Sequence, residues 1–101
     1  MFERKRVSRD EVMLTVIGSL SAETTAEFQR EVEELTEGDS VTITLNLAGT
    51  PSINSSALGK ILLFRKKLAE QQRTLQIRGC SENLYKTFQM IKFDTLISIQ
   101  K

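Results

Sequence analysis

The clearest pattern in the chain is an alternation of apolar and polar residues between Val41 and Leu47. Valine, isoleucine and leucine occupy every second position, and threonine or asparagine lies between them. A two-residue period is typical of a β-strand, because successive side chains point to opposite faces of a sheet. A similar alternation over Val12–Ile17 predicts a second strand, which we expect to be central.

Three shorter segments have weaker strand patterns. Phe2–Ser8 carries three consecutive cations at positions 4–6. Charged side chains discourage pairing with a second molecule, so this segment suits an edge strand. Thr74–Arg78 has alternating apolar residues, and Leu96–Gln100 is expected to be a final short strand. A loop is expected over Ala48–Ile53, because this segment contains a glycine and a proline.

Apolar residues at steps of three and four predict three helices between these strands. They are expected at about 22–35, from about 55 to 72, and after 81. Each begins near a residue type that favours the N-cap position: Ser21, Asn54 or Ser55, and Ser81. The expected buried faces are Ala22, Ala26, Phe28, Val32 and Leu35, then Leu58, Ile61, Leu62, Leu68 and Ala69, and finally Leu84, Phe88 and Ile91.

The alternation of strands with helices predicts an α/β fold. Helices that connect neighbouring strands produce parallel pairs through right-handed crossovers. We therefore expect a mixed sheet of four to five strands with covering α-helices. A chain of 101 residues is sufficient for one core, so residues 1–101 are expected to be one domain. Met90, Ile91, Phe93 and Cys80 are expected to contribute to that core.

Charge and cysteine content narrow the possible partners and the compartment. Fourteen basic and thirteen acidic side chains give a net charge of +1, which provides no strong field for direct nucleic-acid binding. No apolar run approaches the roughly 20 residues that span a bilayer, so membrane insertion is not expected. The single cysteine and the lack of a secretory signal pattern favour a cytoplasmic protein.

The residue types give no support to catalysis. The chain has no histidine, which removes the commonest metal ligand and the usual proton-transfer group near neutral pH. No glycine-rich phosphate loop or dinucleotide motif is present. The acidic residues gather near one helix end, where a solvated surface is expected: Glu31, Glu33, Glu34, Glu37 and Asp39. We therefore expect no enzymatic activity, no metal and no cofactor.

A second charged surface is expected on the helix that follows Asn54. Its cations are Lys60, Arg65, Lys66 and Lys67. Such a surface can contact an acidic partner, or it can simply be solvated near a helix C-terminus.

The segment Ile53–Gly59, at the carboxyl end of the clearest strand, reads Ile-Asn-Ser-Ser-Ala-Leu-Gly. It resembles the Asp-Ser-Ser-Gly-Leu-Gly signature of STAS domains, the family named for sulphate transporters and bacterial anti-sigma factor antagonists. Gly18-Ser19-Leu20 before a helix, and the strand ending at Leu47, are also similar to the family pattern. The resemblance extends along nearly the whole chain and implies the STAS fold.

For anti-sigma factor antagonists, this resemblance implies a phosphorylation switch at the second serine of the signature. That residue is Ser56 here, in preference to Ser55. The implied partner is an anti-sigma factor serine kinase, and a phosphatase acting on phosphoserine would reverse the modification. The unmodified antagonist binds the kinase and so frees a sigma factor for transcription. The implied partner-binding residues are Thr50, Pro51, Ser52, Ile53, Asn54, Ser55, Ser56, Ala57 and Lys60.

Two departures from the signature leave an alternative open. Asn54 replaces the aspartate and keeps a helix cap without the charge. Ala57 replaces the glycine, and its methyl group is expected to lie where a kinase must approach Ser56. The alternative is a STAS scaffold, or a cytosolic subunit of a transport complex, that is never phosphorylated. Nucleotide binding is a third possibility for the family, although the glycine pattern here does not support it.

Overall fold

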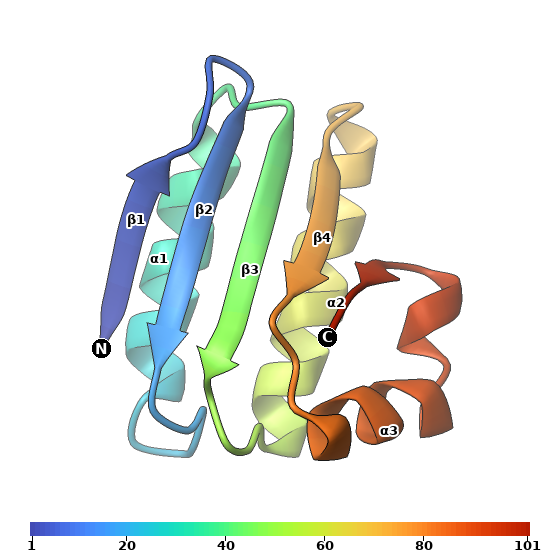
Figure 1. Ribbon diagram of the computed structural model, residues 1–101. Helices are drawn as coiled ribbons and strands as arrows, with labels where there is room; N and C mark the ends of the chain where they lie inside the picture. The colour runs from blue at the N-terminus through green and yellow to red at the C-terminus, as the bar shows by residue number, and fades with distance from the viewer.

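Five strands form one sheet in the order β1-β2-β3-β4-β5, which is also their order along the chain (Figure 1). The computed structural model describes residues 1–101. β1 is antiparallel to β2, and the other neighbours are parallel. The strands are β1 Phe2–Arg6, β2 Glu11–Ile17, β3 Thr42–Gly49, β4 Thr74–Arg78 and β5 Ser98–Ile99. The predicted mixed sheet is confirmed.

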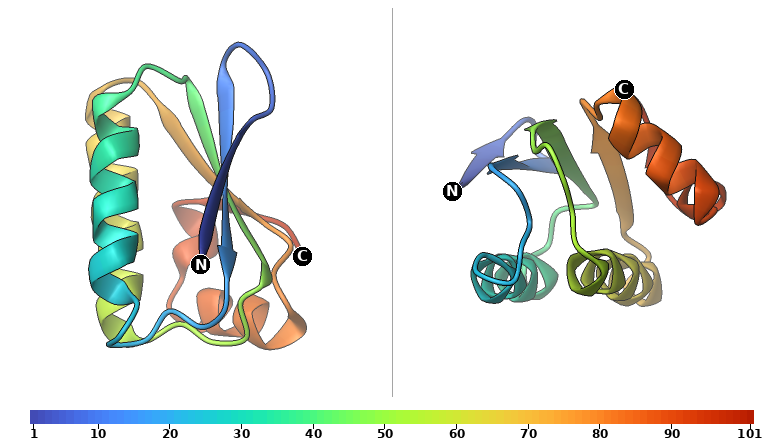
Figure 2. Two further views of the ribbon diagram at one scale, coloured as in Figure 1. Left: turned by 90° about the vertical axis from the view of Figure 1, so that its left-hand side faces the viewer. Right: turned by 90° about the horizontal axis from the view of Figure 1, so that it is seen from below.

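Two of the three helices cover one face of this sheet. Figure 2 shows α1 and α2 side by side on that face, whereas α3 lies at the end of the sheet that holds β4 and β5. The helices are α1 Thr25–Glu37, α2 Ser55–Glu70 and α3 Glu82–Met90, followed by a short 3-10 helix, η1, at Phe93–Thr95. The pairing of α1 with α2 places the beginnings of both helices at the same end of the domain.

The core lies between the sheet and the α1–α2 layer and continues under α3. The inward positions of β2 and β3, such as Leu14 and Leu45, are fully buried. Phe28 of α1, Phe64 of α2 and Phe88 of α3 are also fully buried. Burial of such side chains contributes about 1.5–3 kcal/mol each. The apolar pattern therefore fixes which face each helix turns towards the sheet.

The strand predictions are confirmed in position, with differences at the ends. Val41 was expected to begin the clearest strand, but it is 49% exposed and β3 begins one residue later. β3 continues through Gly49, into the segment that was expected to be a loop. β5 contains only two residues of the expected 96–100 segment.

The first helix begins later than its sequence indicates. The prediction that Ser21 caps a helix from Ala22 is wrong, because α1 begins at Thr25 with Thr24 as N-cap. The Ser21 carbonyl accepts hydrogen bonds from the amides of Thr24 and Thr25 and closes a separate turn. As a result Ala22 and Ala26 are exposed, and Thr25 takes an inward position.

The buried face of α2 is also rotated from the predicted one. Leu62 is 39% exposed and Ala69 is exposed, although both were expected in the core. The fully buried positions are instead Ala57, Ile61, Phe64 and Leu68. These recur at steps of four, three and four, which is one continuous helical face. Phe64 decides the phase, because an aromatic ring buries more area than a leucine.

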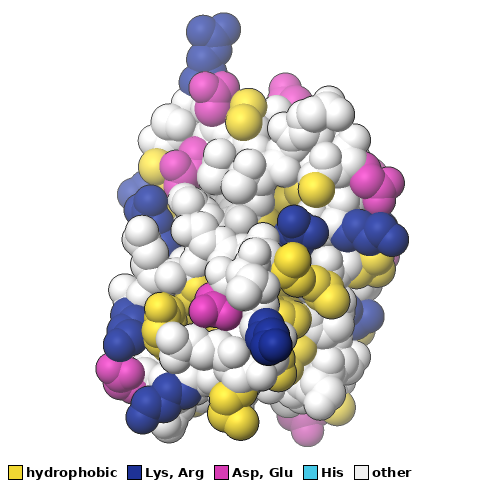
Figure 3. Space-filling model, turned by 90° about the vertical axis from the view of Figure 1, so that its right-hand side faces the viewer, with side chains coloured by type: hydrophobic (Ala, Val, Ile, Leu, Met, Phe, Trp, Pro, Cys, Tyr) yellow, Lys and Arg dark blue, Asp and Glu magenta, His cyan; other side chains and the backbone are white.

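The segment after α3 is more exposed than predicted. Met90 is 83% exposed and Ile91 is 43% exposed, whereas Phe93 is buried. Lys92 has a left-handed backbone (φ 62°), which turns the chain so that Phe93 returns to the core, where Ile97 is also buried. Figure 3 views this side of the molecule and shows apolar side chains at the surface among lysines and arginines. Cys80 is buried, as predicted.

Candidate functional site

The loop between β3 and α2 is held against the loop between β2 and α1. The Thr50 hydroxyl donates a hydrogen bond of 2.8 Å to the Val16 carbonyl. Leu20 and Ile53 form a parallel β-bridge, and the Asn54 amide donates to the Leu20 carbonyl at 2.9 Å. The Ser52 and Ser19 hydroxyls lie 2.9 Å apart. These contacts fix where α2 begins.

Asn54 is the N-cap of α2, as predicted for Asn54 or Ser55. Its backbone is extended, and its Oδ1 accepts a hydrogen bond of 2.8 Å from the Ala57 amide. A side-chain oxygen at this position satisfies one of the free amides in the first turn of a helix. The cap therefore directs Ser55 and Ser56 into the first turn of α2.

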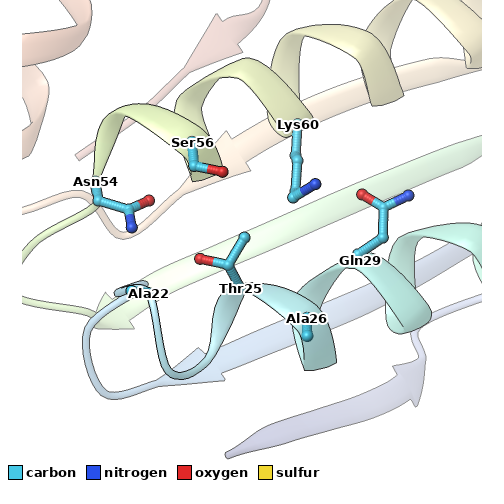
Figure 4. A pocket seen from close by; sticks show the side chains of 7 residues that line it. All are labelled: Ala22, Thr25, Ala26, Gln29, Asn54, Ser56 and Lys60. Atoms are coloured by element: carbon cyan, nitrogen blue, oxygen red, sulfur yellow. The ribbon is translucent and has the colours of Figure 1, made fainter.

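A groove of about 530 Å³ lies between the beginnings of α1 and α2. Asn54, Ser56 and Lys60 line it from the α2 side. Thr25, Ala26 and Gln29 line it from α1, and Ala22 lines it from the turn before α1 (Figure 4). Ser56 is exposed, and its hydroxyl has no hydrogen-bond partner within the protein. The groove therefore opens beside a free serine hydroxyl.

Lys60 is the only charged side chain that lines this groove. It is half-buried and takes part in none of the three salt bridges of the protein. Gln29 faces it from α1, and the Gln29 amide nitrogen is occupied by a 2.8 Å hydrogen bond to Glu33. The groove thus contains an unpaired cation and no carboxylate.

The predicted partner-binding residues divide into three groups by exposure. Pro51, Ser52, Ser55 and Ser56 are exposed. Ile53, Asn54 and Lys60 are half-buried. Thr50 is 2% exposed and Ala57 is fully buried, so their side chains cannot contact a partner in this structure. Thr50 instead holds the loop and Ala57 faces the core, so the inclusion of these two residues in the contact surface stays a prediction.

The position of Ala57 also corrects a second expectation. Its methyl group was expected to lie where a kinase approaches Ser56. Because the side chain is fully buried, the methyl group is directed away from the surface that carries the Ser56 hydroxyl. Replacement of the family's glycine therefore leaves the approach to Ser56 open.

The α1 side of the groove was missed by the sequence analysis. Thr25 and Gln29 were not singled out, because the predicted helix began too early and placed Ala22 and Ala26 in the core. The basic surface expected on α2 is also divided. Lys60 lines the groove, whereas Arg65 and Lys66 line a separate hollow with Leu62 and Leu63. Interpreting Ser21 as the start of a turn, instead of as a helix cap, would have given the correct position of Ala22 and Ala26.

Two further observations concern metal ligands and membrane spans. No group of three or more histidine, cysteine, aspartate or glutamate side chains is arranged to hold a metal ion. None of the helices combines the length and the apolar character that a membrane span requires.

Comparisons with solved structures show where this fold recurs. A candidate anti-sigma factor antagonist from Thermotoga maritima is 24% identical, with a TM-score of 0.88, over 99% of this chain and 86% of that chain. The phosphorylated form of the Bacillus cell fate determinant SpoIIAA is 19% identical, with a TM-score of 0.77, over 100% and 92%. A sulfate transporter family protein from Wolinella succinogenes is 17% identical, with a TM-score of 0.79, over 95% and 80%.

Two comparisons at the level of sequence gave different results. A search of curated proteins found no match. The family model of the STAS domain matches residues 3–101. Since that match extends over almost every residue, the chain belongs to the STAS domain family.

Proposed function

We propose that this protein is an anti-sigma factor antagonist that binds an anti-sigma factor serine kinase in the cytoplasm and is regulated by phosphorylation of Ser56. The unmodified protein occupies the kinase and so permits sigma-factor-dependent transcription. The observation that carries this proposal is the exposed, unpartnered hydroxyl of Ser56 in the first turn of α2. The protein itself acts by binding and has no catalytic role.

The surroundings of Ser56 provide a surface on which a partner can act. Pro51, Ser52 and Ser55 are exposed beside it, and Lys60 lies one turn further along α2. A phosphate in the first turn of a helix is stabilised by free backbone amides, by about 0.3–1 kcal/mol. That energy is too small to account for a regulatory switch.

The larger effect of phosphorylation is expected at the partner interface. The modification adds about −1.5 to −2 charges, which disrupt an apolar or acidic contact. A penalty of about 2.7 kcal/mol weakens binding roughly a hundredfold. Charge effects at protein interfaces reach this size. A phosphatase acting on phosphoserine 56 would restore binding.

The test is the intact mass of the protein after incubation with ATP and a native lysate. The proposal predicts a gain of one phosphate, which Ser56→Ala abolishes and Ser55→Ala retains. Ser56→Asp should weaken binding to the kinase by about tenfold to a hundredfold. If no cognate kinase adds phosphate to the protein, the proposed function is wrong.

A second candidate function is a STAS scaffold, or a cytosolic subunit of a transport complex, that is not phosphorylated. Asn54 favours it, because the carboxylate of the family signature is missing. The fold similarity to a sulfate transporter family protein fits it equally. Co-purification with a membrane transporter, without a kinase, would favour this second candidate.

A further inference from the structure

Lys60 lies four residues after Ser56 on α2, and both side chains line the groove between α1 and α2. We propose that this groove is a phosphoryl-binding site in which Lys60 holds a phosphate carried by Ser56 of the same chain. The inference rests on the proposed function only for the use of Ser56 by a kinase. The geometry of the groove is independent of that use.

The spacing places the two side chains next to each other. Residues four apart on a helix are neighbours, and an anion that precedes a cation is the favourable order for such a pair. Figure 4 shows the Lys60 side chain extending into the groove between Ser56 and Gln29. Lys60 has no ion pair within the protein, so a phosphate would not have to displace a carboxylate.

Asn54 contributes a second donor to the same groove. Its Oδ1 is occupied by the helix cap, whereas its amide nitrogen donates no hydrogen bond within the protein and points towards Ala22 on the opposite side of the groove (Figure 4). An aspartate at this position would put a carboxylate beside the phosphate. The asparagine keeps the cap and replaces that negative charge with a hydrogen-bond donor. Asn54 and Lys60 thus both make the groove more favourable for an anion.

The neighbouring serine lacks this arrangement. Ser55 is followed four residues later by Gly59, which has no side chain, and Ser55 does not line the groove. Lys60 therefore distinguishes two adjacent serines that are both exposed. A phosphate at position 56 would be stabilised by Lys60, whereas a phosphate at position 55 would have no such contact.

The site would change the charge that a partner encounters. In the unmodified protein the groove presents the single positive charge of Lys60. A phosphate with a charge of about −1.5 to −2 neutralises that positive charge and leaves the groove with a net charge of about −0.5 to −1. One modification therefore removes a cation and creates an anion at the same place.

The experiment installs phosphoserine at position 56 or at position 55 of the full chain during synthesis, so that no kinase is needed. A ³¹P NMR titration then measures the second pKa of each phosphate, which is ordinarily near 6. Lys60 is the charged group facing the phosphate from α2. The α1 side of the groove presents Gln29, which is bound to Glu33. The chain has no histidine that titrates in this range.

We expect the pKa at position 56 to lie about 0.3 unit below that at position 55. Lys60→Gln should remove the difference and Lys60→Arg should retain it. Lys66→Gln, on the same helix but outside the groove, should have no effect. An unchanged pKa at position 56 in Lys60→Gln would overturn the proposal.

The outcome is separable from the proposed function. A pKa that depends on Lys60 supports the phosphoryl site even if no kinase modifies Ser56. The opposite result is also informative. If a kinase modifies Ser56 but the pKa of the phosphate does not depend on Lys60, the switch is supported and the phosphoryl-binding site is rejected.

Discussion

Asn54 connects the departure from the STAS signature to the stability of the domain. Its Oδ1 caps α2 through the Ala57 amide at 2.8 Å. We predict that Asn54→Ala lowers the free energy of unfolding by about 1 kcal/mol, because the capping hydrogen bond is lost. Urea unfolding followed by circular dichroism measures this change.

Asn54→Asp is the matched control for that substitution. It keeps a capping oxygen and adds a negative charge near the positive end of the helix dipole, so its stability should equal or slightly exceed that of the parent. Equal losses in the alanine and aspartate variants would show that the cap is not responsible.

Cys80 provides a pH-dependent prediction. Burial raises the pKa of its thiol to about 11, from an ordinary value of 9.0. The folded protein therefore keeps the thiol protonated at a pH where the unfolded chain has begun to lose the proton. The stability from this group is complete below about pH 9 and is lost as the pH rises towards 11, by up to about 2–3 kcal/mol.

The measurement compares the parent with Cys80→Ala across that pH range. Each free energy of unfolding also contains contributions from the other ionisable groups, which both proteins share. Subtracting the free energy of unfolding of Cys80→Ala from that of the parent isolates the contribution of the thiol. This difference should fall as the pH rises above 9. A constant difference up to pH 11 would contradict the assignment.

At the scale of elements, the sequence predicted which segments are strands and helices better than it predicted helix phase. Alternating Val41–Leu47 and Val12–Ile17 identify β3 and β2, because a strand has one apolar face. In α2, both Leu62 and Phe64 fit an apolar stripe when the chain is considered alone. Only packing against the sheet decides between them, and Phe64 is buried.

The position of Ser56 was predictable because it depends on a local motif. Asn54 caps a helix wherever that helix packs, so Ser56 follows in the first turn. The α1 side of the groove depends on where α1 begins. That start is set by the turn at Ser21 and by the bridge between Leu20 and Ile53, a contact between segments far apart in the sequence.

Arg73 joins elements in a way that no sequence pattern indicated. Its guanidinium, 9% exposed, donates to the carbonyls of Ser40, Thr36 and Leu35 at 2.6 to 2.9 Å. Burial lowers the pKa of Arg73, and the charge of Asp39 partly opposes that shift. The side chain thereby connects the start of β4 to the end of α1 and the loop after it.

We predict that Arg73→Met lowers the free energy of unfolding by about 2–4 kcal/mol, because three carbonyls lose a charged donor. Arg73→Lys should recover less than half, since one ammonium cannot reproduce the planar set of donors. Urea unfolding measures both. Arg65→Met, which removes a cation from α2 without such bonds, should change stability by less than about 0.5 kcal/mol. A lysine variant as stable as the parent would contradict this account.

At the scale of the whole molecule, the position of the helices leaves two sheet edges to be protected. α1 and α2 cover one face, and the edge strands are β1 and β5. β5 has only two residues, which gives little opportunity for pairing. β1 has five residues and carries Arg4, Lys5 and Arg6. Arg4 is paired with Glu31 and Glu34 of α1, which leaves the other two cations to protect the edge.

We predict that replacing both Lys5 and Arg6 with glutamine promotes self-association, because an edge strand without these two unpaired cations presents its free backbone groups to a second molecule. Light scattering during size-exclusion chromatography should detect dimers at about tenfold lower concentration, which corresponds to about 1.4 kcal/mol. Replacing Lys66 and Lys67 with glutamine is the matched control, since either pair takes the net charge from +1 to −1. If both double variants associate equally, net charge rather than edge protection keeps the protein apart. If only the β1 variant associates, the cations of β1 act on the edge itself. Partner binding at the Ser56 end of the parent protein can then be studied without self-pairing of the sheet.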